Sequence, residues 1–230
     1  MTDLLSLLKK PLNFLCLAAF FISFYMIFLY APIEMQEGVV QKIMYFHIPQ
    51  AWCAFGAFFL VFCFSILFLW KKDREWDIYA NSAAEVGIIF CSLVLITGPI
   101  WAKPVWGVWW TWDARLTLTL VLWFIYAAYL MLRAQSLNPS MKAKYCAVLG
   151  IVGFLDVPLI HFSVLWWRTM HPQPKVLVMT GDGPGSGMPP EMLITLLSSV
   201  IAFTLLFFVL FNMRNNVEKL KDEIEHLKTL

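Results

Sequence analysis

Charged residues are scarce in this chain of 230 residues. Asp, Glu, Lys and Arg make up 14% of it, whereas 60% is hydrophobic and the mean hydropathy is +0.72. A soluble domain needs a charged and polar surface, so this composition argues against one. The net charge of only +2 also lacks the basic excess that is typical of nucleic-acid binding, and we expect no nucleic-acid partner.

Short metal-binding and nucleotide-binding motifs are also missing. None of the five cysteines forms a CxxC or CxxCH motif, which excludes a zinc ribbon and covalent haem attachment. The glycine-rich stretch GDGPGSG at 181–187 has no Lys-Ser or Lys-Thr after it, so it is not an ATP-binding loop. We interpret the cysteines as small buried hydrophobic residues and the glycine-rich stretch as part of a loop.

Long apolar runs, by contrast, occur six times. Each is about 20 residues long, enough to cross a hydrocarbon core of about 30 Å as a helix and too long for barrel strands. We predict an all-α polytopic membrane protein with one six-helix domain at 1–211 and a cytoplasmic amphipathic tail at 212–230. The predicted spans are Leu12–Tyr30, His47–Trp70, Tyr79–Ile100, Arg115–Arg133, Lys144–Leu165 and Glu191–Phe211.

The basic residues indicate the orientation of these helices. Of the 17 Lys and Arg residues, twelve fall on one side of the predicted membrane and five on the other. Cytoplasmic loops carry the excess of Lys and Arg, so both termini are predicted to be cytoplasmic. The outward loops, periplasmic in a bacterial inner membrane, are then about 31–46, 101–114 and 166–190.

The second outward loop contains an unusual stretch, WGVWWTWDARLT at 106–117. If this stretch is helical, Trp106, Trp109, Trp110 and Asp113 fall on one face. With Trp112, such a segment would present an aromatic platform for a large, flat, apolar ligand at the membrane surface. The alternative is that these tryptophans only anchor the protein at the interface, where the residue is enriched.

Histidines and cations on the same side complete a candidate site. His47 and His171 both lie outward and could ligate the iron of a porphyrin from its two faces. His161, near the outer end of the fifth span, is either a supporting contact or a histidine bonded within the bundle. Lys103, Arg115 and Arg168 could pair with carboxylates of the ligand, or could be ordinary interfacial cations.

Two carboxylates near these groups have less certain roles in the sequence. Asp113 either pairs with Arg115, caps the following helix or contacts the ligand. Asp156 lies near the middle of the fifth span, where an ionisable group is costly. A helix break at Pro158 could bring Asp156 closer to His161.

The stretch at 106–117 resembles the tryptophan-rich WWD signature of the haem-handling membrane proteins of cytochrome c maturation. With six spans and 230 residues, the chain is most similar to the CcmC family, the haem exporter C proteins. The resemblance extends from the histidine-bearing stretch at 45–52 to 160–171. The haem lyases with the same signature have more spans and larger outer domains, for which this chain has no room.

The resemblance implies that haem b is held without a covalent bond at the outer leaflet, with His47 and His171 as axial ligands of the iron. It also implies transfer of haem to the chaperone CcmE, in a complex with the ABC transporter subunits CcmA and CcmB and the small protein CcmD. The expected haem-contacting residues are Trp106, Trp109, Trp110, Trp112, Asp113, Arg115, Lys103, Arg168 and His161. We expect a binding and delivery protein rather than an enzyme.

Two other functions compete with this interpretation. A transporter that moves haem across the bilayer would need a polar path, and Glu85 and Asp156 are the main polar groups within the spans. A membrane cytochrome that transfers electrons would need histidine pairs buried within the spans, and only His161 is well inside one.

Overall fold

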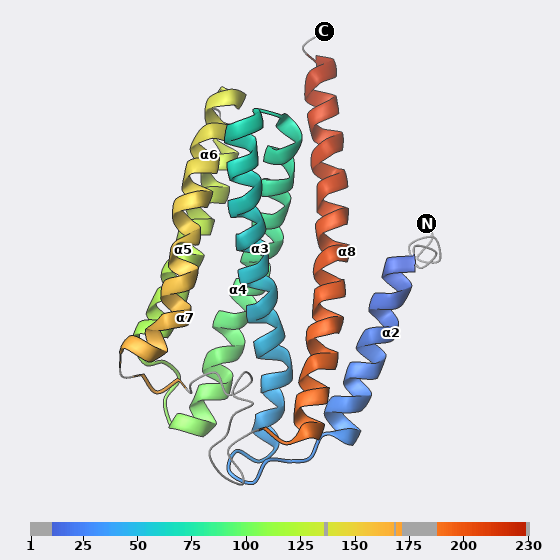
Figure 1. The fold of residues 1–230 in the computed structure, drawn as a ribbon, viewed down its shortest axis with the longest axis vertical. Coiled ribbons are helices and arrows are strands. Elements are labelled where there is room, and N and C mark those ends of the chain that lie inside the picture. The colour runs from blue at the N-terminus through green and yellow to red at the C-terminus, as the bar shows by residue number, and fades with distance from the viewer. Residues whose placement is uncertain (1–10, 136–137, 168, 172–187, 229–230) are drawn as a thin grey trace.

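The computed structural model describes residues 11–135, 138–167, 169–171 and 188–228, and its regular structure there is helical (Figure 1). Six helical segments in this part are long and apolar enough to cross a membrane, which confirms the prediction of an all-α, multi-pass membrane protein. They are Pro11–Tyr30, Val39–Lys71, Arg74–Trp106, Ala114–Ala134, Pro139–Trp166 and Pro190–Ile224. Each contains the span predicted for it, because capping and turn residues, rather than apolarity, decide where a helix ends.

The helices pack around a central antiparallel pair, α3 and α4. Figure 1 shows α5, α6 and α7 on one side of this pair, and α8 followed by α2 on the other. The elements are α2 (Pro11–Tyr25), a π-helical turn η1 (Met26–Tyr30), a 3-10 turn η2 (Val39–Ile43), α3 (Met44–Lys71), α4 (Arg74–Trp106), α5 (Ala114–Ala134), α6 (Pro139–Phe154), α7 (Asp156–Trp166) and α8 (Pro190–Lys228).

A two-residue link makes α3 and α4 antiparallel. Lys72 adopts a left-handed conformation at the end of α3, with φ of 57°, and its N–H donates to the Phe68 carbonyl at 2.7 Å. Asp73 then caps α4, its carboxylate accepting from the Glu75 N–H at 3.0 Å. In the middle of the pair, a Cβ on Gly87 would lie 2.8 Å from the Phe58 ring, so only glycine allows this approach.

The fifth span is broken into α6 and α7 at Leu155. The break lies three residues before Pro158, because a proline ring conflicts with the carbonyl four residues earlier and lacks the N–H that would bond to it. Asp156, just after the break, is buried, whereas His161 is exposed on the other side of α7. The break therefore does not bring these two side chains together.

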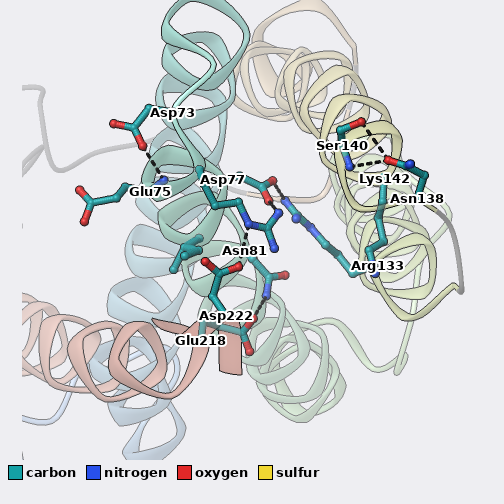
Figure 2. A network of polar contacts seen from close by, with 12 residues as sticks. Asp73, Glu75, Asp77, Asn81, Arg133, Asn138, Ser140, Lys142, Glu218 and Asp222 are labelled. Carbon is teal, nitrogen blue, oxygen red and sulfur yellow. Dashed lines mark hydrogen bonds and ion pairs between the residues drawn. The ribbon is translucent and has the colours of Figure 1, made fainter. Parts of the chain in front are cut away.

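The final helix, α8, runs without interruption across the predicted boundary between 211 and 212 (Figure 1). Its C-terminal part is bound to α4: Arg74 donates to Asp222 and Asn81 donates to Glu218, both at 3.0 Å (Figure 2). Further along, Arg214 donates to Glu85 at 2.7 Å. The residues predicted to form a separate tail thus extend the bundle, at least to Lys228.

Asp77 is the centre of this polar network (Figure 2). Its side chain is 2% exposed and accepts from Arg74 at 2.6 Å and from Arg133 at 2.5 Å. Arg133, 12% exposed, also donates to the Tyr129 hydroxyl at 2.7 Å. One buried carboxylate therefore joins the start of α4 to the end of α5.

We expect Asp77→Ala to destabilise the fold strongly, because it leaves the Arg133 guanidinium buried without its carboxylate. Such a loss costs about 3–5 kcal/mol. Asp222→Ala is the matched control, since it removes the more exposed partner of Arg74 and should cost about 1 kcal/mol or less. Unfolding of the detergent-solubilised variants measures both, and equal losses would contradict the role assigned to Asp77.

Candidate functional site

The predicted site residues gather at the end of the bundle opposite the Asp77 network, which is the end predicted to face outward. α3 begins there and α4 ends there, and α5 begins and α7 ends at the same end of the bundle (Figure 1). His47 is in the first turn of α3, Trp106 is the last residue of α4, and Asp113 immediately precedes α5. Side chains distant in the sequence therefore meet at this end because the helices alternate in direction.

His47 is held against α4. Its Nδ1 lies 2.8 Å from the Thr97 hydroxyl oxygen. Its ring meets the ring of Trp101 edge-on, with centroids 5.8 Å apart. The backbone of Gly98 passes so near that an added Cβ would lie 3.3 Å from the His47 Cε1. The imidazole is thus oriented by three residues of one helix.

His171 lies in the segment that follows α7. Its ring packs edge-on against Trp106, with centroids 6.4 Å apart. Its backbone N–H donates to the Thr169 hydroxyl at 3.1 Å. His171 and Arg115 both lie near enough to His47 to interact with it electrostatically. The structure therefore brings the two predicted iron ligands and one predicted cation together.

The tryptophan stretch is not a continuous helix, so the predicted common face of Trp106, Trp109, Trp110 and Asp113 is wrong. α4 ends at Trp106 because Gly107 adopts a left-handed conformation with φ of 78° and donates to the Lys103 carbonyl at 3.0 Å. Helix resumes only after Asp113, whose carboxylate accepts from the Leu116 N–H at 3.1 Å. Residues 107–113 form a connecting loop.

The four tryptophans consequently have different surroundings. Trp109 and Trp112 are 59% and 76% exposed, whereas Trp106 and Trp110 are half-buried. The rings of Trp110 and Trp112 meet edge-on at 5.8 Å. The buried indole N–H of Trp110 has no acceptor within the described residues. An aromatic surface is present, but it is made by a loop rather than by one helix face.

The predicted cations Lys103, Arg115 and Arg168 also have different surroundings. Lys103 donates to the Gly107 carbonyl at 2.8 Å, so its ammonium group helps to end α4. Arg115 is half-buried and interacts electrostatically with His47 and with Asp113, and its guanidinium makes no hydrogen bond in the part of the chain that the structure describes. Arg168 lies outside the described residues.

Asp113 is occupied by bonds within the protein. One oxygen caps α5, and the other accepts from the Thr111 hydroxyl at 3.0 Å. The predicted cap is thus confirmed, and this carboxylate holds the loop to α5. His161 is exposed on α7, where its ring contacts Phe162 at 5.4 Å. The structure does not bring His161 to His47.

Two residues near the site were not predicted from the sequence. Thr97 contacts His47, and Glu37 accepts from the Trp101 indole N–H at 2.9 Å, which attaches the first outer loop to α4. A threonine within an apolar run is a weak signal, because the sequence does not show which residue of α3 faces it. Glu37 likewise has no pattern that connects it to Trp101.

Known proteins resemble this chain over most of its length. A family model described as "CcmC: Heme exporter protein C" matches residues 1–229. The haem exporter protein C of Bradyrhizobium diazoefficiens is 40% identical over 189 residues, which cover 81% of this chain and 70% of that protein. The haem exporter protein C of Haemophilus influenzae is 34% identical over 194 residues, covering 84% and 77%.

A relative from a plant matches a similar share of this chain. A cytochrome c biosynthesis ccmC-like mitochondrial protein of Marchantia polymorpha is 34% identical over 180 residues, which cover 78% of this chain and 75% of that protein. The family model extends over all the helices described above. This multi-pass membrane protein therefore belongs to the CcmC family, the haem exporter C proteins.

Proposed function

We propose that this chain binds haem b at the outer face of the bacterial inner membrane and delivers it to the haem chaperone CcmE. Membership of the CcmC family supports the broader role, which is haem handling in cytochrome c maturation. Haem is in this view the cargo of the protein. The binding site, the recipient and the outward location are the parts that we propose.

One observation carries the proposal: His47 and His171 lie near each other at one end of the bundle, with Trp101 and Trp106 packed on their rings. Neutral imidazoles are common axial ligands of haem iron. Indole rings beside them would cover the porphyrin faces and exclude water. The described residues therefore fit a porphyrin held between two histidines.

The polar groups around the histidines fit the edges of the same ligand. Haem carries two carboxylates, and the half-buried Arg115 guanidinium makes no hydrogen bond among the described residues, although Asp113 interacts with it electrostatically. Arginine pairs with carboxylates through two parallel hydrogen bonds. The buried Trp110 N–H, also without an acceptor there, is a second donor for such a group. We assign Arg115 to a haem carboxylate and leave Arg168 as a further candidate.

Delivery requires that part of the ligand stays accessible. Trp109 and Trp112 are the exposed tryptophans of the loop at 107–113. A loop can adapt to a partner more easily than a helix face can. We propose that CcmE docks over these two side chains and removes the haem, with CcmA, CcmB and CcmD in the same complex. This chain then forms no covalent bond itself and acts as a binding and delivery protein, not an enzyme.

The two competing functions receive less support from the described residues. Glu85 is neutralised by Arg214 near the cytoplasmic end, and Asp156 lies buried at the α6–α7 break, so these groups do not form a continuous polar path. His161 is exposed on α7 rather than buried between helices. The first fact disfavours a haem channel through the bundle, and the second disfavours a haem within the spans.

We expect His47→Ala and His171→Ala each to reduce or shift the Soret band of the purified protein in detergent, because each removes one axial ligand. His161→Ala is the matched control and should leave the band unchanged, since its side chain is exposed away from the site. A band altered by His161→Ala but not by His171→Ala would place the second ligand in α7 and contradict the assignment.

Transfer can be tested in cells that rely on the variant for cytochrome c maturation. We expect covalent haem on CcmE to fall with His47→Ala and to persist with His161→Ala. Normal haem loading of CcmE by the His47→Ala protein would contradict delivery from this site. Haem binding without any transfer to CcmE by the unaltered protein would contradict the proposed recipient but retain the site.

We also expect Asp113 to act through the loop rather than through the ligand. Asp113→Asn keeps a capping oxygen and should retain the Soret band, whereas Asp113→Ala loses the cap, about 0.5–2 kcal/mol of stability and part of the haem binding. Absorbance and thermal unfolding of the same samples measure both effects. Equal loss of haem in the two variants would show that the negative charge itself is required.

A further inference from the structure

We propose that Thr97 is a positioning residue that holds His47 in the tautomer with a proton on Nδ1, which leaves Nε2 free to ligate iron. This inference rests on the proposed function for the identity of the ligand. The tautomer itself is a property of the protein alone. It can be tested without haem.

The hydrogen-bond geometry determines which atom carries the proton. The Thr97 hydroxyl oxygen lies 2.8 Å from the Leu93 carbonyl oxygen and 2.8 Å from the His47 Nδ1. The Leu93 carbonyl oxygen and, at 3.3 Å, the Gln50 Oε1 can only accept, so we assign the single hydroxyl proton of Thr97 to this side, with Leu93 as the nearer acceptor. The hydroxyl oxygen then faces Nδ1 with a lone pair, and this assignment puts the ring proton on Nδ1.

The neighbours of His47 restrict its ring to one orientation. Trp101 contacts it edge-on, and the Gly98 backbone lies against its Cε1 side. Gln50, one turn further along α3, places its Oε1 3.3 Å from the Thr97 hydroxyl. A 180° rotation of the ring would put Cδ2 in the place of Nδ1 and break the bond to Thr97.

An ordinary helical threonine would make the bond to the backbone carbonyl but not the contact with a histidine. Thr119, Thr195 and Thr204 also donate to the carbonyl four residues earlier, at 2.8, 2.7 and 2.7 Å. Within the described part of the chain, Thr97 is the threonine that combines this bond with a contact to a histidine. The backbone bond sets its hydroxyl direction, and this direction makes it an acceptor for Nδ1–H.

The functional consequence follows from how metals bind histidine. A hydrogen bond from the other ring nitrogen fixes the tautomer and makes the ligating nitrogen a better donor, and its loss typically costs 10–100-fold in metal affinity. A stronger donor stabilises oxidised iron relative to reduced iron. Thr97 should therefore tighten haem binding and lower the reduction potential of the bound haem.

The test compares Thr97→Val, which keeps the shape but removes the acceptor, with Thr97→Ser, which keeps the hydroxyl. In haem-free protein, ¹⁵N shifts of the His47 side chain should report an Nδ1–H tautomer in the unaltered chain and in Thr97→Ser. They should report an Nε2–H or mixed tautomer in Thr97→Val. Thr204→Val, which removes the same kind of backbone bond on α8, should leave these shifts unchanged.

With haem added, Thr97→Val should bind about 10–100-fold more weakly and have a raised reduction potential. Thr97→Ser and Thr204→Val should match the unaltered protein. An unchanged tautomer in Thr97→Val, or equal effects of Thr97→Val and Thr204→Val, would overturn the proposal. A changed tautomer in a protein that binds no haem would support the role of Thr97 and instead contradict the proposed function.

Discussion

The close approach of α3 and α4 is the contact on which the rest of the structure depends. It is possible because Gly87 has no side chain where the Phe58 ring lies, and because the link through Lys72 and Asp73 reverses the chain within two residues. Two helices held at this distance keep a constant register over their whole length. The register set at the centre therefore decides which side chains meet at each end.

The side chains that this register brings together differ between the two ends of the bundle. At the end that holds Asp77, this carboxylate pairs with Arg133 and Arg74, and Glu218 and Asp222 attach α8 to the same helix. At the opposite end, His47 meets Thr97 across the same pair, and the buried Trp110 N–H has no acceptor among the described residues. Ion pairs between helices dominate the first end, whereas histidine and indole rings dominate the second.

The outer loop shows how local capping overrides helical periodicity. The spacing of Trp106, Trp109 and Trp110 fits one helix face, but Gly107 ends α4 in a left-handed conformation and Asp113 begins α5. The result is an aromatic surface with two exposed and two half-buried indoles on a loop joined to rigid helices. Such a surface suits the proposed role, because His47 is fixed on a helix while the loop can adjust to a partner.

The sequence by itself determined the six spans, because long apolar runs must be helical where no water can bond to the backbone. It also indicated His47, His171 and Arg115 as candidate site residues, since histidines are few and the distribution of basic residues predicts which side of the membrane each loop occupies. Only the tertiary structure decided that Thr97 faces His47, that Asp113 serves the loop, and that His161 points away. These three outcomes depend on how helices far apart in the chain are aligned with one another. The hydrophobic periodicity of a single helix does not show that alignment.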